Sequence, residues 1–128
     1  MARKKPKTLT KAELRIMQVL WEKRKATVAE VAAGLPAPPL AYTTVLTMLR
    51  ILEQKGIVAH VVDGRAHVYH PCIEHDDAAT SAVGDVLRSF FSNSKTALAV
   101  RLMAEERPSH DELASIKALI ARYEDERT

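Results

Sequence analysis

The hydrophobic pattern is clearest in residues 40–56, where apolar positions return at helical spacing. At about 100° of rotation per residue, one face of this helix holds its aliphatic side chains: Val45, Met48, Leu49 and Leu52. The opposite face holds polar side chains: Thr43, Thr47, Arg50 and Gln54. Threonine methyls and hydroxyls, together with a guanidinium, suit the base edges and phosphates of DNA. The segment therefore predicts a DNA-reading helix.

Two helices are predicted upstream by capping boxes, in which a Ser or Thr is followed three residues later by Glu. Thr10 and Glu13 open the first, whose expected inward side chains are Leu14, Met17, Leu20 and Trp21. Thr27 and Glu30 open the second, whose expected inward side chains are Val28, Val31, Ala32 and Leu35. Residues 36–39, Pro-Ala-Pro-Pro, form a stiff turn into the third helix. Three helices with this tight turn are typical of a helix-turn-helix.

A β-hairpin is predicted directly after the third helix. Gly56 stands where a left-handed C-cap is expected, and two β-rich runs in residues 57–71 flank Asp63-Gly64, a dipeptide typical of tight hairpin turns. A hairpin in this place is a wing, and its tip carries Arg65. Arg65 is either an exposed turn residue or a contact with the DNA backbone or minor groove, and we favour the contact.

Residues 76–128 predict three more helices, separated by Ser92-Asn93-Ser94 and by Pro108. Ser109 and Glu112 form a third capping box, which opens the last helix. A segment this short buries too little surface to form a stable core alone. We expect its apolar side chains to meet a second copy in a homodimer, or, as the alternative, the winged helix of the same chain. The expected dimerisation residues are Val83, Val86, Leu87, Phe90, Leu98, Leu102, Leu113, Ile116, Leu119, Ile120 and Tyr123.

Charge is unevenly distributed along the 128 residues. Residues 1–75 contain 12 Lys and Arg against 6 Asp and Glu, whereas residues 76–128 contain 7 against 10. A basic first part fits a nucleic-acid partner. Residues 1–8 form a basic arm whose Arg3, Lys4 and Lys5 are either phosphate contacts or solvated charges. Neither an apolar run of about 20 residues nor a signal segment occurs, so we expect a cytoplasmic protein without stable membrane association.

Four residues between His67 and His75 could in principle bind a metal ion. His67, His70, Cys72 and His75 are metal-ligand types, but their spacing matches no usual paired-ligand pattern and alternation puts His67 and His70 on opposite strand faces. We expect no metal and no cofactor, and a metal- or redox-responsive regulator using these four groups stays an alternative. No phosphate-binding glycine loop or activated nucleophile is recognisable, so the sequence predicts a protein that is not an enzyme.

Several motifs resemble the penicillinase repressor family, which includes the methicillin-resistance and copper-transport repressors. They are Thr43-Thr44-Val45, Thr47, Leu49, Leu52 and Lys55-Gly56, preceded by residues 14–21 and followed by the Asp-Gly wing. The resemblance extends from about Leu9 to Tyr123. It implies a winged-helix dimer that represses promoters by occupying a dyad. It also implies DNA-contacting positions at Thr43, Thr44, Thr47 and Arg65.

The resemblance further implies how such a repressor is released. Members of the β-lactam branch are inactivated by proteolysis in the second of the three C-terminal helices, at a place that corresponds here to Arg101-Leu102. The family's scissile bond follows an asparagine where this chain has arginine, and the protease partner would be a membrane-bound sensor. Copper-responsive members carry a cysteine-rich C-terminal motif, which this chain lacks because Cys72 is its single cysteine.

These patterns predict a mainly α-helical protein with a small β-hairpin. A winged helix-turn-helix would occupy residues 1–75 and a three-helix dimerisation region residues 76–128. The predicted function is a DNA-binding transcriptional repressor, acting as a homodimer on a palindromic operator. Inactivation by proteolysis in the C-terminal region is what the resemblance adds to this prediction. A winged-helix module for protein interaction is the other alternative. The expected DNA-contacting residues are Ala41, Tyr42, Thr43, Thr44, Thr47, Arg50, Gln54, Arg65 and His67, together with Arg3, Lys4 and Lys5 of the arm.

Overall fold

The computed structural model describes residues 9–127, in two compact units that divide between Gly84 and Asp85. The division falls inside helix α4 (His75–Phe91), beyond the expected boundary after residue 75. The predicted basic arm, with Arg3, Lys4 and Lys5, lies outside the described residues.

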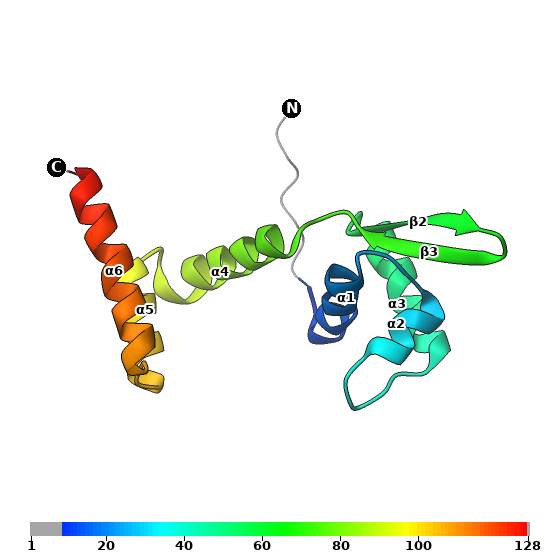
Figure 1. The fold of residues 1–128 in the computed structure, drawn as a ribbon, viewed down its shortest axis with the longest axis horizontal. Coiled ribbons are helices and arrows are strands. Elements are labelled where there is room, and N and C mark those ends of the chain that lie inside the picture. Colours follow the sequence, from blue (N-terminus) through cyan, green and yellow to red (C-terminus); the bar gives the residue numbers. More distant parts are fainter. Residues whose placement is uncertain (1–8, 128) are drawn as a thin grey trace. The chain divides into compact units, whose positions relative to one another are not determined.

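Helices and a small sheet make up the first unit (Figure 1). Its elements before α4 are α1 (Lys11–Lys23), β1 (Ala26–Thr27), α2 (Val28–Gly34), α3 (Tyr42–Gln54), β2 (Val58–Asp63) and β3 (Ala66–Pro71). The predicted three helices and hairpin are confirmed. Strand β1 was not predicted: it pairs antiparallel with β3, so the strand order is β1-β3-β2. The structure is therefore a winged helix with a three-stranded sheet.

Local signals explain where these helices begin. The Thr10 hydroxyl accepts a hydrogen bond from the Glu13 backbone N–H at 3.1 Å, and the Glu13 carboxylate accepts one from the Thr10 N–H at 2.9 Å. Thr27 and Glu30 repeat the arrangement at the start of α2. Both predicted capping boxes are confirmed, and each satisfies N–H groups that a helix start would otherwise leave unpaired.

The wing depends on a glycine at its turn. Asp63 pairs with Ala66, which leaves Gly64 and Arg65 as a two-residue loop. Gly64 has φ 63°, a positive value that costs glycine little and that tight hairpin turns require in their loop. Strands β2 and β3 extend away from the three helices, with this loop at the far end (Figure 1).

One hydrophobic core joins the helices to the sheet in the first unit. Its buried side chains are Ile16, Met17, Leu20, Ala26, Val28, Val31, Val45, Leu49, Leu52, Ile57, Val58 and Tyr69. Full burial of an aliphatic side chain contributes about 1.5–3 kcal/mol, so this set is the main stabilising element of the unit. It also fixes α3 by its aliphatic face.

The inward face of α1 differs from the prediction at one position. Met17 and Leu20 are buried as predicted, but Leu14 is 38 % exposed, so its assignment to the core is wrong. Glu13 is buried instead, with 5 % exposure. The helix tolerates this because the Lys55 ammonium lies 2.8 Å from the Glu13 carboxylate and compensates the buried charge.

Two side chains of α1 hold the segments around α3 and α4. Arg15 donates hydrogen bonds to the carbonyls of Pro36 and Pro38, and so fixes the turn that leads into α3. Trp21 donates its indole N–H to the Ile73 carbonyl at 2.9 Å, and its ring meets the His75 ring edge-on at 5.1 Å. The chain between β3 and α4 is thereby attached to α1.

The second unit contains the rest of α4, α5 (Lys95–Glu105) and α6 (His110–Arg127). Ser92 and Asn93 have positive φ angles of 49° and 65°, which end α4 at the predicted break. The third capping box is also confirmed, because Ser109 and Glu112 exchange hydrogen bonds at 2.9 and 3.1 Å. No residue of α4, α5 or α6 is buried. No helix among residues 9–127 has the length and apolar character to cross a membrane.

Candidate nucleic-acid interface

Helix α3 has the two contrasting faces that its sequence predicts. Its inner face is held in the core by Val45, Leu49 and Leu52, each with 0 % exposure. The candidate residues on the other side are all exposed: Ala41, Tyr42, Thr43, Thr44, Thr47, Arg50 and Gln54. The buried side holds the helix in place, and the exposed side offers hydroxyl, methyl, amide and guanidinium groups. We call this exposed side the outer face of α3.

The first turn of α3 is unlike those of the other capped helices. Ala41 occupies the N-cap position without a side-chain hydrogen bond, and the first turn contains no acidic residue. Helices α1, α2, α5 and α6, by contrast, begin beside a Ser or Thr whose oxygen accepts a backbone N–H. Free N–H groups and the positive end of the helix dipole make such a start favourable for an approaching phosphate.

The hydroxyl of Thr47 is already engaged within the helix. Its Oγ1 donates to the backbone carbonyl of Thr43 at 3.0 Å. The hydroxyl can then accept a hydrogen bond from a ligand but has no proton left to donate. Thr47 consequently offers a methyl group and an acceptor to any partner of the outer face.

One residue of the outer face was missed by the sequence analysis. Ile51 is 41 % exposed, although it is a large aliphatic residue in the middle of α3. Reading apolar positions as core positions gave no reason to single it out. Its place one turn after Thr47 was the signal that could have found it.

The wing adds a second exposed surface. Arg65 and His67 are both exposed, and Arg65 belongs to the loop at the wing's tip. On β2, His60 lies with its Nδ1 2.7 Å from the Glu53 carboxylate of α3, and its ring stacks on His67 with 4.3 Å between centroids. His60 was not a predicted site residue, yet it connects the wing to α3. This connection fixes the wing relative to the outer face.

The four possible metal ligands are not brought together. Among residues 9–127, no three His, Cys, Asp or Glu side chains are grouped so that they could hold a metal ion. Desolvation of the sulfur and the nearby Glu53 carboxylate raise the pKa of the Cys72 thiol, although the residue as a whole is exposed. A raised pKa keeps the thiol protonated, whereas metal binding and redox chemistry both need the thiolate.

Comparison with known proteins decides the family. The penicillinase repressor family matches residues 9–122. The chain belongs to this family. It is similar to the transcriptional regulator BlaI of Mycobacterium tuberculosis, with 34 % identity over 115 residues, covering 88 % of this chain and 82 % of that protein. The chain is thus a transcriptional repressor of this type with a winged-helix DNA-binding domain.

Solved structures of the same family resemble its first unit. The solution structure of the DNA-binding domain of the repressor BlaI matches with TM-score 0.51 and 34 % identity, covering 59 % of this chain and 93 % of that chain. Bacillus licheniformis BlaI, solved as a monomeric form in complex with the blaP half-operator, matches with TM-score 0.50 and 34 % identity over the same shares. The second of these repressors is seen with DNA.

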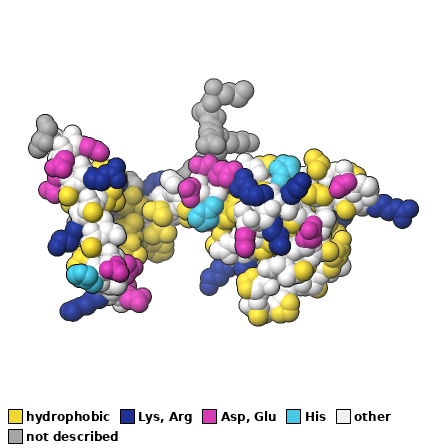
Figure 2. All heavy atoms as spheres, viewed as in Figure 1, with side chains coloured by type: hydrophobic (Ala, Val, Ile, Leu, Met, Phe, Trp, Pro, Cys, Tyr) yellow, Lys and Arg dark blue, Asp and Glu magenta, His cyan; other side chains and the backbone are white. Residues whose placement is uncertain are grey.

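Helices α4, α5 and α6, which we call the tail, expose several large apolar side chains, coloured yellow in Figure 2. Phe90 is 81 % exposed and Leu102 64 % exposed. The other large exposed apolar side chains of α4, α5 and α6 are Val83, Val86, Val100, Leu113, Leu119, Ile120 and Tyr123. The predicted residues Leu87, Leu98 and Ile116 are half-buried. Large exposed apolar patches are typical of surfaces that take part in association.

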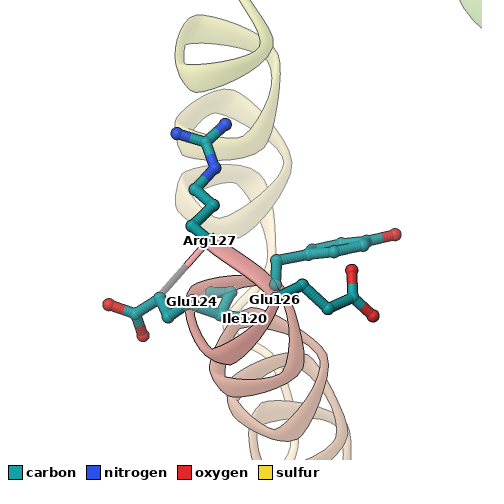
Figure 3. A pocket seen from close by; sticks show the side chains of 5 residues that line it. Ile120, Glu124, Glu126 and Arg127 are labelled. Carbon is teal, nitrogen blue, oxygen red and sulfur yellow. The ribbon is translucent and has the colours of Figure 1, made fainter.

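A hollow of about 550 Å³ lies at the end of α6, lined by Ile120, Tyr123, Glu124, Glu126 and Arg127. Figure 3 shows the charged side chains of Glu124, Glu126 and Arg127 pointing in different directions. A small-molecule site would need polar groups that converge on one point. The hollow therefore gives no support for a small-molecule site.

Proposed function

We propose that the chain is a homodimeric repressor that inserts α3 into the major groove of a palindromic operator and so blocks a promoter. The observation that carries the proposal is the outer face of α3: exposed threonines and Arg50 on a helix whose opposite side is fully buried. The likeness to a repressor solved with its half-operator supports this docking. A helix of this width fits the major groove of B-DNA.

The proposed contacts divide into base reading and phosphate binding. Thr43, Thr44 and Thr47 face base edges, and Gln54 extends the surface at the end of the helix. Ala41 and Tyr42 bring the uncapped first turn of α3 close to a phosphate. Arg50 and the wing residues Arg65 and His67 contact the backbone, as does the arm through Arg3, Lys4 and Lys5. Phosphate contacts set orientation and affinity, whereas base contacts set sequence preference.

We further infer that the exposed apolar residues of the tail are buried against a second copy. Two-fold symmetry would present two copies of α3 to two halves of a palindrome. The tail has no buried residue of its own, so association supplies the missing core. Linking two half-sites raises affinity by about 10²–10⁴-fold without any new base contact.

Release by proteolysis would act through this linkage. The corresponding bond, Arg101-Leu102, lies inside α5, and both residues are exposed. A protease binds an extended substrate, so α5 would have to unwind locally before cleavage. The partner would be a membrane-bound sensor protease, while the repressor itself works in the cytoplasm and catalyses no reaction.

The proposal is tested with the full-length protein and the DNA upstream of its own gene. Binding is titrated at several salt concentrations in the presence of unrelated duplex. We expect saturable binding that persists in the presence of the competitor. The logarithm of the binding constant should fall linearly with the logarithm of the salt concentration. Equal affinity for both duplexes, or binding unaffected by salt, would contradict a DNA-reading role. Sedimentation should give the mass of a dimer, and a single-chain mass would contradict the proposed symmetry.

A further inference from the structure

Ile51 is an exposed aliphatic residue that the folded core of the first unit does not use. Its side chain is 41 % exposed, while the nearby Leu49 and Leu52 of the same helix are fully buried. Leu46 and Met48, the other partly exposed aliphatic residues of α3, pack against the core. Ile51 is therefore available to a partner at no cost to the core.

Its position on the helix relates it to the threonines. At about 100° per residue, Ile51 lies roughly 20° from Thr44 and 40° from Thr47 around the helix axis. The three side chains form a stripe one turn apart, on the outer face. Because the Thr47 hydroxyl donates to the Thr43 carbonyl, the stripe presents methyl groups as much as polar ones.

We propose that Ile51 is a specificity-determining residue that recognises thymine by packing against its 5-methyl group in the major groove. The inference rests on the proposed function, because it needs α3 to enter that groove. Thymine is the one base that displays a methyl group there, and apolar side chains contact it directly. A threonine offers a single methyl for this contact, whereas Ile51 offers a larger apolar surface that removes the thymine methyl from water more fully.

The test uses the full-length protein and a duplex that it selects from a random pool. Each thymine of this duplex is replaced in turn by deoxyuridine, which lacks only the 5-methyl group. At one thymine in each half-site the wild-type protein should lose about fourfold in affinity, the amount expected for one buried methyl. Ile51→Ala should bind the thymine and uracil duplexes equally. Ile51→Val keeps a branched apolar side chain and should retain the preference.

Leu14→Ala is the matched control, since Leu14 is similarly exposed but lies on α1. It should keep the wild-type ratio between thymine and uracil duplexes. If Ile51→Ala shows the wild-type loss at every thymine, or if no methyl affects the wild-type protein, the inference is overturned while DNA reading stands. A wild-type protein that selects no duplex at all would overturn the proposed function and this inference together.

Discussion

The Glu13 carboxylate of α1 and the Lys55 ammonium at the end of α3 lie 2.8 Å apart. The other oxygen of Glu13 accepts the Thr10 backbone N–H, so one side chain caps α1 and also holds α3. Burial alone would raise the pKa of Glu13, but Lys55 and the hydrogen bonds with Thr10 outweigh it, and the pKa is lowered. The pair therefore stabilises the folded state and fixes the position of the proposed DNA-reading helix.

Replacing this carboxylate by an amide should weaken the fold. Glu13→Gln leaves the Lys55 ammonium without its anion, and we expect a loss of about 1–3 kcal/mol in the free energy of unfolding at pH 7. Urea unfolding measures it. Glu22→Gln, which removes the same charge from an exposed position of α1, should cost far less. A similar loss in both variants would show that net charge, and not the pair, is responsible.

The same pair predicts a pH dependence. Because the folded pKa of Glu13 is lower than the usual 4.5 of a glutamate, its contribution is complete above pH 4.5 and is lost as the pH falls through the folded value. The difference in unfolding free energy between wild type and Glu13→Gln should accordingly shrink as the pH is lowered below 4.5. A constant difference from pH 7 into this acid range would contradict the assignment.

Loss of a positive charge at the wing should change the salt response of DNA binding. Arg65→Ala should weaken operator binding and reduce the slope of log K against log salt concentration by about one unit. Arg50→Ala should weaken binding as well, since Arg50 lies on the outer face of α3. Fluorescence anisotropy at a series of salt concentrations gives both quantities. Lys117→Ala in α6 changes the net charge by the same amount and should leave the slope unaltered. A wild-type slope and affinity in the Arg65 and Arg50 variants would contradict the proposed docking of the wing and α3 on DNA.

Charge on the apolar side of α6 should dissociate the proposed dimer. Leu119→Asp or Ile120→Asp would bury a carboxylate at the interface, which is strongly unfavourable. We expect soluble single chains by analytical ultracentrifugation and a loss in operator affinity of about 10²-fold or more. Ala118→Asp, on the other side of α6 at helical spacing, should remain a dimer. An unchanged mass for both interface variants would remove α6 from the interface.

The turn of the wing should tolerate few residues at position 64. Gly64 has φ 63°, and a Cβ there would meet no atom within 4 Å, so a substitution is penalised by backbone conformation alone. Gly64→Val should cost about 1–2 kcal/mol of stability and weaken DNA binding by disturbing the wing. Gly64→Asn should stay close to wild type, because asparagine adopts this conformation more readily. Equal behaviour of the two variants in thermal unfolding would contradict the conformational explanation.

Local signals account for the parts of the fold that the sequence analysis predicted correctly. The capping boxes, the proline turn, Gly56 and the Asp63-Gly64 hairpin each depend on residues a few positions apart, and all lie where expected. Strand β1 is different, because its two residues form a strand only through pairing with Tyr69 and Val68, far along the chain. Neither residue pattern nor length could have indicated it.

Exposure of side chains could be predicted from the sequence only where it depends on local periodicity. The polar residues of α3 follow from helical periodicity, but the burial of Glu13 depends on Lys55, which meets α1 only after folding. Ile51 was overlooked because an aliphatic residue in a helix is ordinarily assigned to the core. The role of His60 was not predicted because its partners, Glu53 and His67, belong to two different elements.

Trp21 is the single tryptophan of the chain, and it is attached to Ile73 and His75 where the sheet passes into α4. Its intrinsic emission therefore reports on the winged helix alone, while circular dichroism records every helix, those of the tail included. If helical circular dichroism begins to fall at a lower denaturant concentration than the tryptophan signal, the units melt separately and the tail comes apart while the DNA-binding half stays folded.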